Sequence, residues 1–393
     1  RLEVTLGSGP YKVIDFQVNK FVELKKNPQY WGKNLPSRRG FFNFETIRYD
    51  YYQDTTVTLQ ALFAGNIDAR EEYIAKIWMT GYDNELVKSG KIIKEQLEHN
   101  NPATLQNFAF NLRRSKFEDR RVRKAIDLAF NFEWANTKLF YGQYRRLFSY
   151  FTNTGMEAVG LPEGKEKEIL QRYKDRLNPE IFSVPYSPTF NIDMNNSREN
   201  LKKAVSLLKE AGYDFVDGKM TNLSTKEPLE FEILSSSANG STFTKVMLPF
   251  IENLRKIGIK AVFRNLEINI FKNRLDNFDF DVAIISYPVS QLPGNEQREY
   301  WGSESADIKG SNNIIGIKNP VVDDLIKGLV AVQKKEDYVA YVKALDRVLL
   351  SENYMIFQWY SPYSRIAYRN KFGKPAAKYK IGFQPYLWWV KED

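Results

Sequence analysis

The sequence predicts an α/β protein with at least two lobes. Its 393 residues exceed the size at which a single hydrophobic core stops growing. Between residues 229 and 285, short apolar strands alternate with amphipathic helices, an order that is typical of a sheet with right-handed crossovers. Residues 282–285 form an unbroken apolar run, which indicates a strand covered on both faces.

Each element of this stretch has a local signal. Residues 229–233 alternate apolar and charged side chains, as a strand does. Residues 246–257 carry apolar side chains at helical spacing and stop at Gly258, and residues 261–263 form the next strand. Residues 271–275 lie in a helix before the strand 282–285. This order of strands and helices predicts parallel pairing within the sheet.

The helices outside this stretch are predicted from caps and apolar spacing. A helix that begins after Asp119 buries Val122 and Ile126, and its basic cluster at residues 120–124 is interpreted as a solvated face. Further helices are expected at residues 57–63, 201–211, 320–329 and 338–350, and Gly65 is expected to cap the first of them. Residues 354–368 are strand-like and aromatic.

The strand at residues 282–285 is followed by a different kind of sequence. Residues 286–301 are polar and aromatic and contain Pro288, Pro293 and Gly294, so a long loop is expected there. In open α/β sheets, ligands bind beyond the carboxyl ends of strands, which is where this loop would lie. The alternative is a surface turn with incidental aromatic side chains.

Composition excludes several classes of site. The chain has no cysteine, so disulfides, thiolate metal sites and thiol nucleophiles are absent. Its 57 basic and 48 acidic residues give a net charge of +9, but the charges are interspersed and no nucleic-acid-binding motif accompanies them. No apolar run reaches membrane-spanning length. Aromatic residues make up 15% of the chain, which suits both cores and ligand-contacting surfaces.

The motifs of common enzymes are also missing. His99 is the only histidine, and no nucleotide-binding loop, nucleophile elbow or zinc-protease motif occurs. Carboxylate pairs such as Glu71 with Glu72 and Glu296 with Glu299 leave a carboxylate-dependent hydrolase open as an alternative. A basic protein that associates with polyanions is a second alternative, which would bind with a steep dependence on salt.

Eight motifs in one order resemble a known family. They are GSGPYKV at Gly7, KKNPQYWG at Lys25, LFAGNIDAREEY at Leu62, FEDRRVRKAIDLAFN at Phe117, LLKEAGY at Leu207, LRKIGIKA at Leu254, FDVAIISYP at Phe280 and ALDRVL at Ala344. Together they resemble the periplasmic extracellular solute-binding proteins of family 5, the oligopeptide and dipeptide class of ABC importers. The segments GNIDAREEY, WMTGYD and PVSQLPGNEQREYW are more similar to the subfamily linked to long oligopeptides and microcin C.

The resemblance implies a two-lobed periplasmic-binding-protein-like fold of the cluster C type, with mixed sheets, flanking helices and a hinge. Residues 1–106 would belong to lobe one, residues 107–357 to lobe two, and residues 358–393 would return to lobe one. Family members carry further strands and a domain ahead of the GSGPY turn. That portion is expected to be present as a nicked, disordered or separate chain.

The resemblance also implies a receptor that binds peptides or peptide-like compounds in the periplasm and delivers them to an inner-membrane ABC permease. We expect no catalytic residues, no metal, no cofactor and no nucleic-acid partner. The expected ligand contacts from lobe two are Tyr287, Ser290, Asn295, Glu296, Gln297, Arg298 and Trp301, and those nearer lobe one are Glu72, Trp78 and Tyr360.

Two expectations concern individual contacts. Classical peptide binders hold the ligand's amino terminus with an aspartate near the position of Ser290, which has no charge. Glu296 is expected to replace that aspartate, with Glu72 in reserve. Trp301 and Trp78 are expected to be partly exposed in loops and to report ligand binding.

Overall fold

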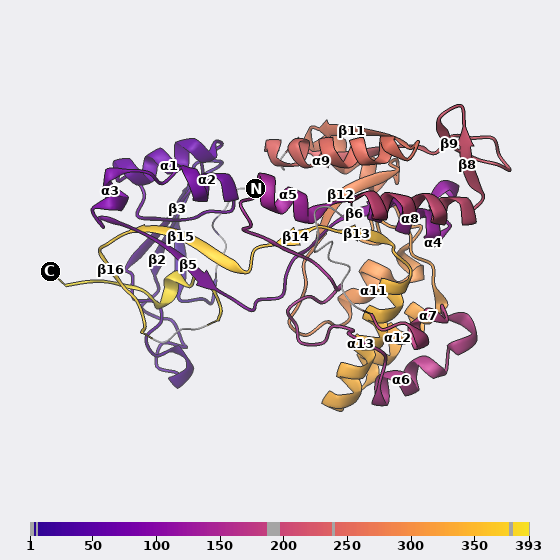
Figure 1. The fold of residues 1–393 in the computed structure, drawn as a ribbon. Coiled ribbons are helices and arrows are strands. Elements are labelled where there is room, and N and C mark those ends of the chain that lie inside the picture. Colours follow the sequence, from indigo (N-terminus) through magenta and orange to yellow (C-terminus); the bar gives the residue numbers. More distant parts are fainter. Residues whose placement is uncertain (1–3, 5–6, 187–196, 238–239, 377–379, 393) are drawn as a thin grey trace. The chain divides into compact units, whose positions relative to one another are not determined.

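The computed structural model describes all residues except 1–3, 5–6, 187–196, 238–239, 377–379 and 393. The chain divides into two compact units (Figure 1): residues 1–100 with 362–393 form unit 1, and residues 101–361 form unit 2. The boundaries expected from sequence lie a few residues away. The first expected boundary, after residue 106, falls inside a strand of unit 2, so the observed junction comes earlier, at residue 101. The second expected boundary, after residue 357, precedes residues 359–360, which pair with another strand of unit 2, so the observed junction comes later, after residue 361.

Unit 2 is built around a five-stranded sheet with the order β11-β10-β12-β6-β13. Its strands are β6 (Leu105–Phe110), β10 (Glu230–Ser236), β11 (Lys260–Leu266), β12 (Val282–Tyr287) and β13 (Met355–Phe357). As the sequence predicts, β10 runs parallel to β11 and β12. In contrast, β6 is antiparallel to β12 and to β13. The sheet is therefore mixed.

Helices and two short strand pairs complete unit 2. The helices are α4 (Arg120–Leu128), α5 (Phe132–Leu139), α6 (Gly164–Gln171), α7 (Glu180–Ser183), α8 (Ser197–Glu210), α9 (Gly240–Lys256), α10 (Ile268–Asp276), α11 (Glu296–Trp301), α12 (Pro320–Ala331) and α13 (Lys335–Ser351). Short 3₁₀ turns lie at Ser115–Phe117, Lys174–Arg176 and Ser303–Ser305 of unit 2 and at Pro36–Arg38 of unit 1. The short strands are β7 (Arg145–Arg146), which pairs with β14 (Trp359–Tyr360), and β8 (Tyr213–Val216), which pairs with β9 (Lys219–Asn222).

Helices cover both faces of the five-stranded sheet. Neighbouring residues of a strand point to opposite faces. On one face, Phe108 packs on Phe130 and Phe250, with ring centroids 5.2 and 5.6 Å away. On the other face, Ala109 belongs to the core cluster that contains Leu345 of α13. Figure 1 shows α4, α5, α8 and α9 on one side of the sheet and α6, α7, α11, α12 and α13 on the other.

The basic cluster on α4 is only partly solvated. Asp119 caps the helix by accepting from the backbone N–H of Arg121, as predicted. Arg123, however, is 2% exposed and donates to the carbonyl oxygens of Phe117, Glu118, Glu352 and Asn353. The interpretation as a uniformly solvated face is therefore wrong for Arg123, which joins the start of α4 to the end of α13.

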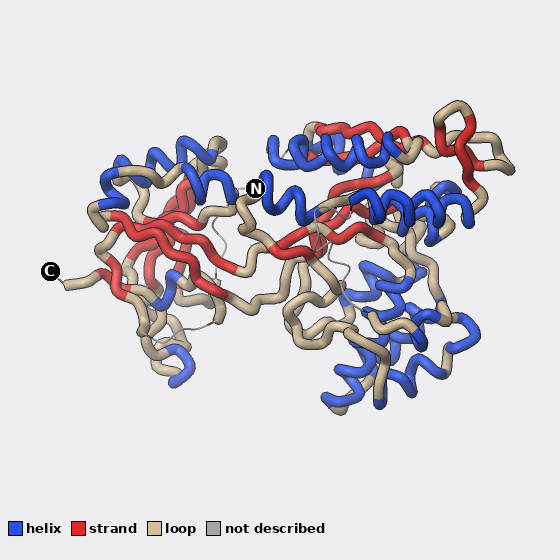
Figure 2. The backbone as a smooth tube through the Cα atoms, viewed as in Figure 1, coloured by secondary structure: helices blue, strands red, loops and turns tan. Residues whose placement is uncertain are grey.

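Unit 1 contains two three-stranded antiparallel sheets, coloured as strands in Figure 2. Their elements are β1 (Tyr11–Gln17), β2 (Phe21–Lys26) and β3 (Thr46–Asp50) in the first sheet and β4 (Ala69–Glu71), β15 (Tyr363–Arg369) and β5 (Ile92–Glu98) in the second. The remaining elements are α1 (Thr55–Ala64), α2 (Ala75–Thr80), α3 (Glu85–Lys88), the turn Pro385–Leu387 and the strand pair β16 (Phe372–Gly373) and β17 (Trp389–Val390).

Two details of the chain path bear on the sequence predictions. Gly65 ends α1 with a φ of 89°, so the predicted left-handed cap is confirmed. Residues 354–368 are not one strand: β13 and β14 lie in unit 2 and β15 in unit 1, so consecutive short strands pair with different partners. No helix among the described residues combines the length and apolar character that a membrane crossing needs.

Asp346 of α13 is a fully buried carboxylate that fixes a long loop of unit 2. Its side chain is 0% exposed. It accepts hydrogen bonds from the hydroxyl of Ser149 at 2.7 Å, the backbone N–H of Tyr150 at 2.9 Å and the backbone N–H of Ala158 at 2.8 Å. These bonds hold both ends of the loop 149–158 against α13.

We predict that Asp346 makes unit 2 less stable as the pH rises toward neutrality. Burial raises the pKa of Asp346 from 3.8 to about 7, although the hydrogen bonds it accepts lower it. Between these two values the folded chain keeps a proton that the unfolded chain has lost, so the free energy of unfolding falls from about pH 4 to about pH 7, by at most about 1.4 kcal/mol per pH unit.

Urea unfolding at several pH values checks this prediction against Asp346→Asn. The variant cannot ionise at this position, so its free energy of unfolding should change less over the same pH range, whatever its absolute stability. Parallel pH profiles for the two proteins would show that Asp346 is not the group responsible.

Candidate functional site

The candidate site begins where β12 ends, at Tyr287. β12 is an interior strand of the sheet and pairs with β10 on one side and β6 on the other. Pro288 follows it, and residues 288–295 form no helix or strand. The expected loop is shorter than predicted from sequence, because residues 296–301 fold into α11.

Trp301 and Tyr287 are packed inside unit 2. Trp301 is 2% exposed, and its ring lies 5.2 Å from Tyr150, 4.7 Å from Tyr287 and 5.8 Å from Tyr300 between centroids. The indole Nε1 donates to Oε1 of Gln297 at 2.8 Å, which satisfies its polar group. The expectation that Trp301 lies in a loop and is partly exposed is therefore wrong. Trp301, Tyr287 and Gln297 support the segment from within.

Glu296 lies half-buried at the start of α11. Its Oε1 accepts from the backbone N–H of Gly294 at 2.9 Å and from Nε2 of Gln297 at 3.2 Å. Within the described part of the chain it forms no ion pair. Burial, and to a smaller extent the charge of Glu296, raise the pKa of Tyr338 to about 12. The hydroxyl of Tyr338 donates to the carbonyl of Pro293 at 2.7 Å. Glu296 is therefore a carboxylate that two hydrogen bonds hold in place and that no cation of the described residues pairs.

The other polar residues of the segment are exposed. Ser290 Oγ accepts from the backbone N–H of Leu292 at 3.1 Å, so its hydroxyl proton stays available. The side chains of Asn295 and Arg298 are exposed and have no hydrogen-bond or ion-pair partner among the residues that the structure describes. Ser290, Asn295 and Arg298 can therefore bond to a ligand without first breaking an internal contact.

Tyr360, which was expected nearer lobe one, belongs to unit 2. It lies in β14, which pairs with β7, and its hydroxyl donates to Oδ1 of Asn153 at 3.4 Å. Strand pairing with residues 145–146 places it there, ahead of the junction at residue 362.

Glu72 and Trp78 lie together in unit 1 and are both buried. Glu72 is 2% exposed, and its Oε2 lies 2.6 Å from Nη2 of Arg70, whose side chain is also buried. Burial raises the pKa of Glu72, while Arg70 lowers it. Because Arg70 already compensates its charge, the reserve role of Glu72 as an amine anchor is not supported by this geometry.

Trp78 is part of the core of unit 1. It lies in α2 and is 4% exposed, its ring packs on Tyr82 at 5.5 Å, and Nζ of Lys94 lies 4.4 Å from the ring centroid. The expectation that Trp78 is partly exposed in a loop is wrong, because α2 turns its indole onto α1 and the strand β5.

Among the described residues, no three His, Asp or Glu side chains gather in a way that could hold a metal ion. Sequence reasoning missed Tyr150 and Tyr338, which hold Trp301 and Pro293 from residues far away in the chain. No local spacing signals such contacts.

Comparisons with known proteins identify one family. The model of the bacterial extracellular solute-binding proteins, family 5 (middle part), matches residues 2–308. The chain belongs to this family. Among family 5 relatives, the "Probable peptide-binding protein YejA" of Agrobacterium fabrum is 41% identical over 392 residues, which cover 99% of this chain and 63% of that protein. YejA of Escherichia coli K12 is 36% identical, covering 98% of this chain and 63% of that protein. The chain thus spans under two thirds of the length of these relatives.

Solved structures show the same fold at low sequence identity. The oligopeptide-binding protein AppA of Bacillus subtilis, solved with a nonapeptide, has a TM-score of 0.69 and 18% identity, covering 98% of this chain and 67% of that one. A periplasmic oligopeptide-binding protein of Thermotoga maritima has a TM-score of 0.70 and 19% identity, covering 97% and 67%. The predicted α/β periplasmic-binding-protein-like fold is confirmed.

We predict that Trp301→Ala destabilises unit 2 by about 3–5 kcal/mol, because it leaves a cavity beside Tyr150 and Tyr287. Trp31 of unit 1 is 72% exposed and serves as the control. Trp31→Ala should change the free energy of unfolding by less than about 0.5 kcal/mol. Urea unfolding of both variants measures this. A loss for Trp301→Ala as small as that of the control would mean that its indole is not a packing element.

Proposed function

We propose that this chain is part of the substrate-binding receptor of an ABC importer and that it binds peptides or peptide-like compounds in the periplasm without turnover. Membership of solute-binding family 5 supports this proposal. Among proteins of the same fold, AppA was solved with a nonapeptide and DppA of Helicobacter pylori with the peptide STSA. An inner-membrane ABC permease is the partner that takes over the ligand, and no cofactor or nucleic acid takes part.

The observation that carries the proposal is the unpaired carboxylate of Glu296 beside exposed hydrogen-bonding groups. A peptide ligand carries an ammonium at one end, and enclosing that charge costs several kcal/mol unless a carboxylate compensates it. Glu296 supplies the carboxylate, and Ser290, Asn295 and Arg298 supply donors and acceptors for the peptide backbone. Tyr287, Gln297 and Trp301 act indirectly, by holding this segment in place.

The subfamily linked to long oligopeptides and microcin C is the finer proposal. It is supported by the segments GNIDAREEY, WMTGYD and PVSQLPGNEQREYW. Mass spectrometry of ligands released from the native protein tests it, because that subfamily should release long peptides or peptide-like compounds. The same measurement checks for a nicked or separate N-terminal chain, which stays a prediction.

Calorimetry with one released peptide tests the role of Glu296. If Glu296 holds the ammonium, Glu296→Gln should weaken binding of the free-amine peptide by about 2–5 kcal/mol and leave its acetylated form little changed. Glu299→Gln is the matched control, because Glu299 lies exposed on the same helix and the substitution removes the same charge.

The possible outcomes distinguish the role of Glu296 in holding the ammonium from the proposed receptor function of the whole protein. Equal losses for both peptides in Glu296→Gln, or a loss as large in Glu299→Gln, would remove Glu296 from this role. Absence of saturable binding by any peptide to the unmodified full-length protein would overturn the proposed function itself.

A further inference from the structure

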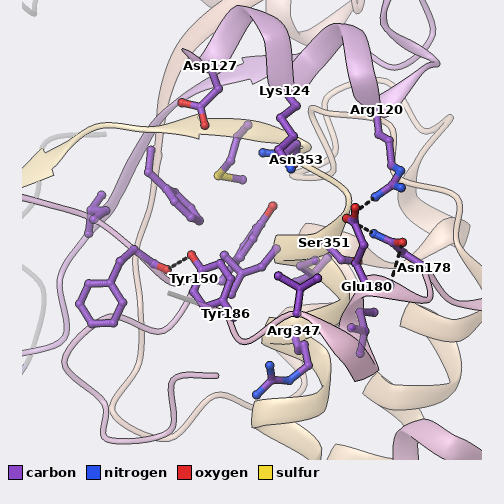
Figure 3. A pocket seen from close by; sticks show the side chains of 18 of the residues that line it. Arg120, Lys124, Asp127, Tyr150, Asn178, Glu180, Tyr186, Arg347, Ser351 and Asn353 are labelled. Carbon is purple, nitrogen blue, oxygen red and sulfur yellow. Dashed lines mark hydrogen bonds and ion pairs between the residues drawn. The ribbon is translucent and has the colours of Figure 1, made fainter. Parts of the chain in front are cut away.

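Unit 2 contains a cavity of about 330 Å³ that none of the residues of the 287–301 segment lines. It lies between α4, α7, the end of α13 and β13 (Figure 3). Part of its wall is apolar, with Ile181 of α7, Leu350 of α13, and Met355 and Phe357 of β13. A cavity of this volume is large enough for a small organic ligand.

The cavity is also lined by Tyr150, a tyrosine of the loop 149–158. Tyr150 is 2% exposed, and its hydroxyl has no hydrogen-bond partner among the residues that the structure describes. In contrast, the hydroxyl of the neighbouring Tyr186 donates to the carbonyl of Phe148 at 2.6 Å (Figure 3). Burial raises the pKa of Tyr150, so the hydroxyl keeps its proton and can donate. A ligand atom can therefore accept a hydrogen bond from this hydroxyl.

The cavity also carries one positive charge more than its carboxylates compensate. Arg146 Nη2 lies 2.7 Å from Oδ1 of Asp127, and Arg347 Nε lies 2.6 Å from Oε1 of Glu166. These pairs are neutral overall.

Two cations share the third carboxylate, because the hydrogen bond from Asn178 and then the charges of Lys124 and Arg120 all lower the pKa of Glu180. Arg120 Nη1 lies 3.5 Å from Oε2 of Glu180, which also accepts from Asn178. Lys124 lines the cavity one helical turn after Arg120 on the same face of α4. No carboxylate of the described residues lies within ion-pair distance of its ammonium. Lys124 is therefore the cation that an anionic ligand would meet.

We propose that this cavity binds a small amphipathic carboxylate, as a second ligand site separate from the peptide segment. Its apolar body would pack on Met355 and Phe357, its carboxylate would pair with Lys124, and one of its oxygen atoms would accept a hydrogen bond from the Tyr150 hydroxyl. A monoanion fits better than a phosphate dianion, because only one positive charge is uncompensated.

Tyr150 also provides a readout. Its ring lies edge-on to Trp301, with centroids 5.2 Å apart, and edge-on to Phe357 at 5.4 Å. A ligand that is hydrogen-bonded to Tyr150 is therefore separated from the indole of Trp301 by one side chain. Its binding should change the tryptophan fluorescence of the protein, and this change should be absent in the variant Trp301→Phe.

Calorimetry and tryptophan fluorescence of the full-length protein test the site with octanoate and 3-phenylpropanoate as probes and octanamide as the uncharged control. We expect at least one carboxylate to bind saturably with a Kd of about 1 mM or lower, and the amide at least about tenfold more weakly. Lys124→Ala and Tyr150→Phe should each weaken carboxylate binding by about tenfold, because each removes one polar partner.

Two controls keep the test decisive. Lys138→Ala removes an exposed lysine of α5, outside the cavity, and should leave carboxylate binding unchanged. Lys124→Ala should leave peptide affinity unchanged, so failure here is distinct from failure of the proposed receptor function. Tyr150→Phe removes a hydroxyl without a partner and should fold normally. Absence of saturable carboxylate binding, or binding that neither Lys124→Ala nor Tyr150→Phe weakens, would overturn the site.

Discussion

The buried carboxylate of Asp346 is the contact on which the arrangement of unit 2 depends. It binds both ends of the loop 149–158 to α13, and that loop carries Tyr150. Tyr150 in turn packs on Trp301 at the end of α11. A carboxylate is costly to bury, and its hydrogen bonds offset that cost only while the loop keeps its path. One acidic side chain thereby sets the position of residues on three separate segments.

This internal support explains why the peptide segment can expose its polar groups. Below the surface, Trp301 donates to Gln297 and packs on the ring of Tyr287. The exposed side chains of Ser290, Asn295 and Arg298 are therefore not needed for packing. The backbone at Pro293 is held by Tyr338 of α13. A binding surface is most effective when its groups are fixed before the ligand arrives, because less conformational entropy is then lost. The segment meets that condition within unit 2.

The sequence predicted what depends on local pattern and missed what depends on distant partners. The strands and helices between residues 229 and 287, the cap at Asp119 and the left-handed Gly65 follow from spacing and backbone chemistry. Burial of Trp301 could not be predicted, because Tyr150 lies far away in the chain and no periodicity links them. Burial of Arg123 could not be predicted either, because its carbonyl partners at Glu352 and Asn353 lie far away in the chain, directly after α13. Of the candidate site, the segment after β12 was predicted, but not which of its side chains face inward.

The position of β15 in unit 1 constrains the order in which the chain can fold. β15 is the middle strand of its sheet and pairs with β4 and β5 on its two sides. Residues 101–361 separate it from both neighbours and form a unit of their own. During synthesis, β4 and β5 leave the ribosome early. They cannot pair with β15, the strand that joins them, until residue 369 has emerged. Unit 2 can close its core first, and the sheet of unit 1 is completed last.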